Sequence, residues 1–250
     1  MNYLSYVILI GLLSGVIGTG AGGLSIILLR KVREKILGIL LGFSAGIMTV
    51  IVFLDLIPES LENGTILSTL TGILLGTGVI SLLDLKFPHQ HFTFVKEMQK
   101  ERKQYFKTGV LLCLGIALHN IPEGLAIGAG FMASAELGVG LAVLIALHNF
   151  PEGMAVATAL GLAKLKDINI LLITILAGVP MGLGAAIGGF LGGISPEFLS
   201  AALGLAGGAM LYVVYDELVP DAHKNASGHS AIVGIIIGII SGIILIEFLH

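Results

Sequence analysis

The sequence has few charged residues and a single cysteine. Only 12% of its 250 residues are charged, whereas 56% are hydrophobic and the mean hydropathy is +1.02. So few charges do not cover the surface of a soluble protein with this much apolar material, which excludes soluble classes and indicates an integral membrane protein. The lone Cys113 excludes an intrachain disulfide. The net charge of −3 carries little information in a chain with so little polar surface.

Apolar runs of about 20 residues, the length that crosses a bilayer core, divide the chain into spans. Eight such runs are present: 4–29, 36–58, 65–85, 108–131, 137–163, 168–192, 197–220 and 230–249. The first run lacks the basic start of a signal peptide and is followed by a basic stop, so we interpret it as a span. We therefore expect one transmembrane domain over residues 1–250, all-α, with eight transmembrane helices and no separate soluble domain.

Lys and Arg are absent from the predicted spans and from every second loop. All 13 fall in the loops after spans one, three, five and seven: Arg30, Lys31, Arg33 and Lys35; six between Lys86 and Lys107; Lys164 and Lys166; and Lys224. Because Lys and Arg concentrate in cytoplasmic loops, both termini are predicted to lie outside. The loop 86–107 is then cytoplasmic, and its His89 and His91 fit metal capture and an ordinary polar loop equally well.

The second and seventh spans share a pattern. GFSAGIMTVIVFLDLIPES (42–60) aligns without gaps with GLAGGAMLYVVYDELVPDA (204–222), which places Asp55 opposite Glu217. Spans four and five form a second matched pair, and spans one and six a weaker one. Since the members of each pair cross the membrane in opposite directions, the chain is predicted to be an interleaved inverted repeat. Such repeats are typical of secondary transporters, whose sites lie near the midplane.

Two motifs place polar residues inside neighbouring apolar runs. HNIPEG (119–124) recurs as HNFPEG (148–153), and in each the His and Glu are spaced i, i+4 on one helix face. The short connection near 133–136 predicts an antiparallel hairpin, with both motifs roughly 20 Å from its outer end. We expect two imidazole–carboxylate pairs with amides beside them: His119 with Glu123, His148 with Glu152, and Asn120 and Asn149.

The predicted spans contain acids without basic partners. A carboxylate at the bilayer centre costs at least ~2.5 kcal/mol and normally pairs or lines a polar path. Either these acids are protonated, or a mobile cation supplies the positive charge. Imidazoles, carboxylates and amides at ligand spacing favour a divalent first-row metal. The acids are Asp55, Glu123, Glu152, Asp216 and Glu217.

Three functions fit buried acids and histidines. An intramembrane metal-dependent hydrolase needs a bound water and a free base, but no H-E-x-x-H pair is present and the symmetric motifs leave no base unused. A proton or monovalent-cation pathway does not require convergent imidazoles and amides. An inverted repeat suits alternating access, so inward transport of a divalent metal is the favoured hypothesis and the hydrolase is the alternative.

At these motifs the chain resembles the ZIP (Zrt/Irt-like) family of divalent metal transporters, nearer its bacterial branch. The resemblance covers eight spans, outside termini, a histidine-containing loop after span three and the paired motifs. It implies uptake of Zn²⁺, and often of Fe²⁺, Mn²⁺ or Cd²⁺, across the cell membrane into the cytoplasm, with the metal as substrate and no cofactor. It also implies a homodimer in the lipid bilayer, no nucleic-acid partner, and movement of spans one, four, five and six against the rest.

The resemblance also implies roles for particular residues. The primary site is similar at His119, Glu123, His148 and Glu152, with Met48 as a candidate further ligand; Asn120 and Asn149 resemble a second site that shares the glutamates. Asp55 fits an entrance, and Asp216 and Glu217 fit an exit. In one departure, Val179 stands before the span-six proline where many bacterial members have glutamate. This leaves open whether the centre holds one metal or two.

Overall fold

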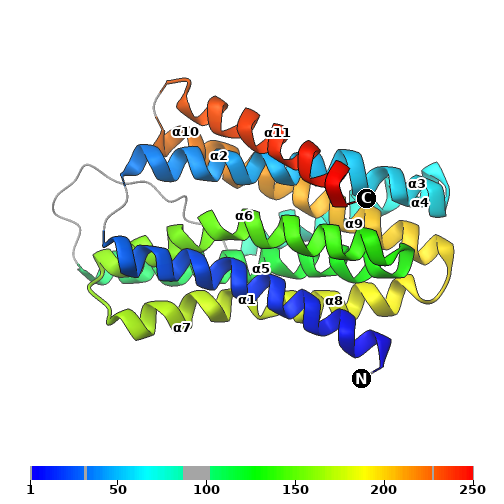
Figure 1. Cartoon of the computed structure of the whole chain (residues 1–250), viewed down its shortest axis with the longest axis horizontal. Coiled ribbons are helices and arrows are strands. Elements are labelled where there is room, and N and C mark those ends of the chain that lie inside the picture. Colours follow the sequence, from blue (N-terminus) through cyan, green and yellow to red (C-terminus); the bar gives the residue numbers. More distant parts are fainter. Residues whose placement is uncertain (1, 31–32, 87–101, 227, 250) are drawn as a thin grey trace.

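The computed structural model describes residues 2–30, 33–86, 102–226 and 228–249, and within them every regular element is a helix (Figure 1). The elements are α1 (Tyr3–Leu29), α2 (Glu34–Val50), η1 (Ile51–Leu56), α3 (Ile57–Asn63), α4 (Ile66–Lys86), α5 (Arg102–Ala133), α6 (Ala135–Leu162), α7 (Asp167–Gly178), α8 (Pro180–Gly192), α9 (Pro196–Val213), η2 (Val214–Leu218), α10 (Val219–Asn225) and α11 (Ser230–Leu249). His89 and His91 lie outside the described residues.

Eight helical stretches of the described chain are long and apolar enough to cross a membrane, which confirms the predicted spans. Span two is α2, η1 and α3; span six is α7 and α8; span seven is α9, η2 and α10; the other spans are single helices. Both termini lie at the same end of the molecule, as an even number of spans requires (Figure 1). Which side of the membrane that end faces stays a prediction.

Spans two and seven run further than the predicted 36–58 and 197–220. The helices continue past Pro58 to Asn63 and past Pro220 to Asn225. In each case the proline lies just after the π-helical segment, inside a helix that continues without a break. The hydropathy pattern indicated an end at these prolines because a proline inside a helix normally stops it.

The inverted repeat is visible in the backbone. The π-helical segments η1 and η2 fall at aligned positions of the two repeated stretches, and each carries the aligned acid, Asp55 or Glu217. Packing follows the same symmetry, because α1 packs on α6 as α8 packs on α5, and α2 packs on α11 as α9 packs on α4. The predicted interleaved repeat is therefore confirmed. Short π segments of this kind often mark functional sites.

Following the predicted movement of spans one, four, five and six against the rest, we group the described helices into two bodies. The first body is α1, α5, α6, α7 and α8; the second is α2, η1, α3, α4, α9, η2, α10 and α11. Glycines without a Cβ let helix backbones approach closely in membranes. Gly15 lies against the backbone of Gly178 in the first body, and Gly208 against that of Ile73 in the second. Wherever a described glycine meets the backbone of another helix, that helix belongs to the same body.

The two bodies meet along a seam where α5 faces α9 and α6 faces α2. The helices of both HNxPEG motifs therefore line this seam. Polar contacts cross it at both motif histidines: the Ser44 hydroxyl donates to the His148 carbonyl at 2.7 Å, and His119 Nε2 lies 3.1 Å from Glu217 Oε1. The first body is joined by glycine contacts throughout, whereas within the second body such contacts join α2 to α10 and α11, and α4 to α9.

Candidate metal centre

The two motifs are carried by a helical hairpin. Helix α5 ends at Ala133 and α6 begins at Ala135, with Ser134 between them. The Ser134 hydroxyl accepts a hydrogen bond from the Leu137 N–H at 3.0 Å, which caps the first turn of α6. So short a connection holds the helices antiparallel and side by side, as the sequence predicted. It brings the two motifs to one level of the bundle.

Three of the predicted ligands come together at that level. One ligand atom from each of Glu123, His148 and Glu152 lies within 4.8 Å of the others, and the three residues are 1%, 0% and 4% exposed. His148 Nε2 is 3.0 Å from Glu123 Oε1. One oxygen of each glutamate, Oε2, has no hydrogen-bond partner in the described part of the chain. A buried acceptor left unpaired costs about 1–3 kcal/mol, so a cation would stabilise this cluster.

The histidines are paired differently from the prediction. His148 contacts Glu123 on the facing helix rather than Glu152 on its own helix, and His119 contacts Glu217 of η2. Residues spaced i, i+4 share a face but stand one turn, about 5.4 Å, apart along the axis. A residue directly across a helix interface can be closer. His119 therefore points to the second body and is not part of the three-residue cluster.

The two asparagines form a separate chain of amides. Asn149 donates to Asn120 Oδ1 at 3.1 Å, and Asn120 donates to the Ala177 carbonyl at 2.7 Å in the last turn of α7. Both asparagines are fully buried. Val179, at the break between α7 and α8, is 41% exposed and offers no ligand atom. Because the Asn120 oxygen already accepts a hydrogen bond, Asn149 Oδ1 is the amide oxygen that stays available.

The remaining predicted residues lie around this centre. Met48 is fully buried on α2, which packs against α6. Asp55 is buried on η1, and Asp216 is exposed on η2 next to Glu217. Neither of the two acids belongs to the ligand cluster found among the described residues.

Ser44 is a site residue that the sequence analysis missed. Its hydroxyl binds the backbone of His148 across the seam. It lies one turn before Met48 on the same face of α2, but a serine in a glycine-rich apolar helix follows no ligand pattern. Its partner is a carbonyl oxygen, which no sequence motif marks.

Known proteins resemble this chain over most of its length. Residues 86–249 match a family described as ZIP zinc transporter. The chain is 34% identical over 246 residues to zinc transporter ZupT of Chlorobium chlorochromatii, covering 90% of each protein. It is 33% identical over 255 residues to zinc transporter ZupT of Chlorobium luteolum, covering 95% of this chain and 96% of that one. For zinc transporter ZupT of Clostridium perfringens the identity is 30% over 276 residues, covering 96% and 94%.

Proposed function

Because the chain belongs to the ZIP family of zinc transporters, we propose that it carries a divalent metal ion, foremost Zn²⁺, across the cell membrane into the cytoplasm. The metal would bind between α5 and α6. The observation that carries this proposal is the buried cluster of Glu123, His148 and Glu152 at the seam. The relatives are named as transporters, which favours transport over the intramembrane hydrolase.

The charge of the cluster suits a divalent ion. Two carboxylates and one neutral imidazole carry a charge of −2, which a divalent metal cancels. A monovalent ion would leave a net negative charge inside the membrane, where uncompensated charge is costly. A set of one nitrogen and several oxygen donors fits Zn²⁺ and also Fe²⁺, Mn²⁺ and Cd²⁺.

His119 and Glu217 would take part in release. Their contact joins the motif helix α5 to the second body. We propose that His119 completes the primary site when metal binds and turns to Glu217 when metal leaves toward the exit, where Asp216 is exposed beside it. Asp55, at the position aligned with Glu217, would serve the entrance, and Met48 stays a candidate ligand.

Alternating access would arise from movement between the two bodies. Glycine contacts hold the helices of the first body together, whereas no described glycine meets the backbone of a helix across the seam. The centre lies on this seam, as sites of inverted-repeat transporters do. Sliding of the first body against the second would open the centre to each side in turn.

We propose that the centre binds one metal per chain. The Asn120 oxygen is engaged, Val179 supplies no acid, and the Asn149 oxygen alone adds little to the shared glutamates. A homodimer is also proposed, on the family resemblance. Helices α4 and α11 leave the most surface for it, since only 22% of the apolar window of each is buried.

The test is zinc uptake into vesicles that contain the purified protein. The variant Glu123→Gln/Glu152→Gln keeps side-chain volume but removes both negative charges, and uptake should be abolished. The matched control is Glu136→Gln, which lies on α6 outside the cluster and is exposed; it should transport normally. Wild-type uptake by the double variant would refute the assignment.

A further inference from the structure

Span six breaks where it passes the first motif. The break lies between α7 and α8, at Val179 and Pro180, and Pro180 has no N–H with which to continue the backbone ladder. Two backbone hydrogen bonds at the break are of the tighter i→i+3 kind: the Val179 N–H donates to the Leu176 carbonyl at 3.3 Å, and the Gly182 N–H donates to the Val179 carbonyl at 3.1 Å. Such a turn leaves room for a side chain to donate to a backbone carbonyl.

The first motif faces this break from α5. Before the break, Asn120 Nδ2 donates to the Ala177 carbonyl at 2.7 Å; after it, a Cβ on Gly124 would collide with the Met181 carbonyl. On both helices the step between these contacts is four residues, or about one turn. The glycine permits backbone contact with α8, whereas a whole asparagine side chain is needed to reach α7. Asn120 therefore spans a gap that opens between α5 and α7.

The second motif joins the same chain of amides. Asn149 Nδ2 donates to Asn120 Oδ1 at 3.1 Å, and both side chains are fully buried. The direction of the chain is fixed by its last member, because a backbone carbonyl can only accept. Asn120 must point its nitrogen at Ala177 and its oxygen at Asn149, so Asn149 must donate as well. The chain therefore needs an amide nitrogen at both positions, and it joins α6, α5 and α7.

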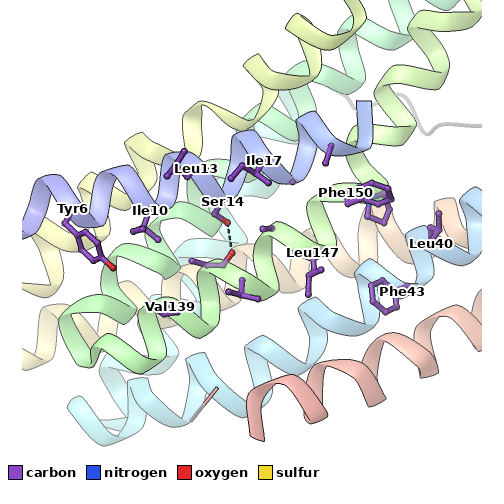
Figure 2. A pocket seen from close by; sticks show the side chains of 16 residues that line it. Tyr6, Ile10, Leu13, Ser14, Ile17, Leu40, Phe43, Val139, Leu147 and Phe150 are labelled. Atoms are coloured by element: carbon purple, nitrogen blue, oxygen red, sulfur yellow. Dashed lines mark hydrogen bonds between the residues drawn. The ribbon is translucent and has the colours of Figure 1, made fainter. Parts of the chain in front are cut away.

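Other side-chain ties within the first body lie further along the helices. Ser14 on α1 donates to the Ala142 carbonyl of α6 at 2.7 Å, on the wall of an apolar groove between α1, α2 and α6 (Figure 2). The Cys113 thiol donates to the Ile173 carbonyl at 3.6 Å, which links α5 to α7 about two turns before Asn120. The amide chain is the tie that joins both motif helices at the level of the motifs.

The asparagines stand next to the acidic ligands on their helices. Asn120 precedes Glu123 by three residues, and Asn149 precedes Glu152 by three. Residues at this spacing are neighbours on the helix surface. Fixing the asparagine therefore also fixes how its helix is rotated about its axis, and with it the direction in which the glutamate points.

We propose that Asn120 and Asn149 are positioning residues. Their amide chain holds α5 and α6 in the rotation that brings Glu123 and Glu152 together, and it anchors both motif helices to span six. The metal is bound by the two glutamates and His148, and the amides act on it only through the glutamates. This effect on zinc binding rests on the proposed function, whereas the chain itself does not.

The chain is tested by thermal unfolding of the full-length protein in detergent with excess chelator. Loss of one hydrogen bond lowers the melting temperature by about 2–4 °C in a chain of this size. Asn149→Ala loses one bond, and Asn120→Ala loses both and should melt about 4–8 °C below wild type. The double variant should melt no lower than Asn120→Ala, because the bond from Asn149 is already gone. Additive effects in the double variant would overturn the proposal. If Asn120→Ala does not fold, Asn120→Ser takes its place in the same comparison.

Positioning is tested by calorimetric titration of the same variants with Zn²⁺. The Asn120 oxygen is already engaged, so a fall in zinc affinity in Asn120→Ala must come through the glutamates; we expect about fivefold or more. Asn149→Ala should lower the affinity no further than Asn120→Ala. The matched control is Asn225→Ala, which removes a buried asparagine with a 2.8 Å bond to the Asp221 carbonyl on α10 and should leave zinc affinity unchanged.

Two calorimetric results would overturn the positioning role. A larger fall in Asn149→Ala than in Asn120→Ala would make the free Asn149 oxygen a ligand. Equal zinc affinities in wild type and Asn120→Ala would show that the chain does not position the glutamates. A wild-type protein that bound no zinc would instead contradict the proposed function, and the melting temperatures, measured without metal, would still report on the chain.

Discussion

Gly153 is the last residue of the second motif. Adding even one methyl group at this position is expected to destabilise the protein. A Cβ at this position would meet the backbone of Thr19 on α1, and backbone cannot turn away as a side chain can. Overpacking of this kind costs about 1–3 kcal/mol. Gly161, on the same helix, has nothing within 4 Å of its Cβ position, so Gly161→Ala is the matched control for Gly153→Ala.

The comparison of the two variants isolates the steric cost. Both gain the same helix propensity from alanine, about 1 kcal/mol, which cancels between them. For a chain of this size 1 kcal/mol changes the melting temperature by about 2–4 °C, so Gly153→Ala should melt about 2–12 °C below Gly161→Ala. Thermal unfolding in detergent, followed by circular dichroism, measures the difference. Equal melting temperatures would show that α1 and α6 are not held together as described.

Three further outcomes are expected. Ser44→Ala removes one hydrogen bond across the seam, worth about 1 kcal/mol, and should change the zinc uptake rate by up to about fivefold. Ser14→Ala removes an equally short bond to α6 within the first body and should leave the rate unchanged. Equal uptake rates in the two variants would argue against movement of the two bodies along this seam. Glu217→Gln should slow uptake while calorimetry still detects zinc binding, and loss of binding would contradict a role in release through His119. Metal analysis of purified protein should find one Zn²⁺ per chain, and two would refute the single-metal centre.

The sequence predicts the fold well because membrane spans obey a simple length rule. Apolar runs located all eight helices, whereas nothing in the aligned stretches indicated the two π segments. The ends of spans two and seven were missed because a proline inside a continuing helix looks the same in sequence as a proline that stops one.

The site was predicted in its residues but not in its contacts. Spacing of i, i+4 identifies which side chains share a helix face, yet the partner of His148 depends on what lies across the helix interface. His119 reaches Glu217, nearly a hundred residues away in sequence, through packing that no local pattern encodes.

The single residue between α5 and α6 has a kinetic consequence. With only Ser134 as a joint, the two motif helices cannot slide past each other by a turn without losing the cap on α6. The metal ligands of both motifs are therefore expected to move together. A bound ion would cross the membrane barrier together with its ligands. The next ion would bind only after the two motif helices had moved back. Flux would then saturate at the rate of a collective domain motion, in the microsecond-to-millisecond range or slower, which is the behaviour of a carrier and not of a pore.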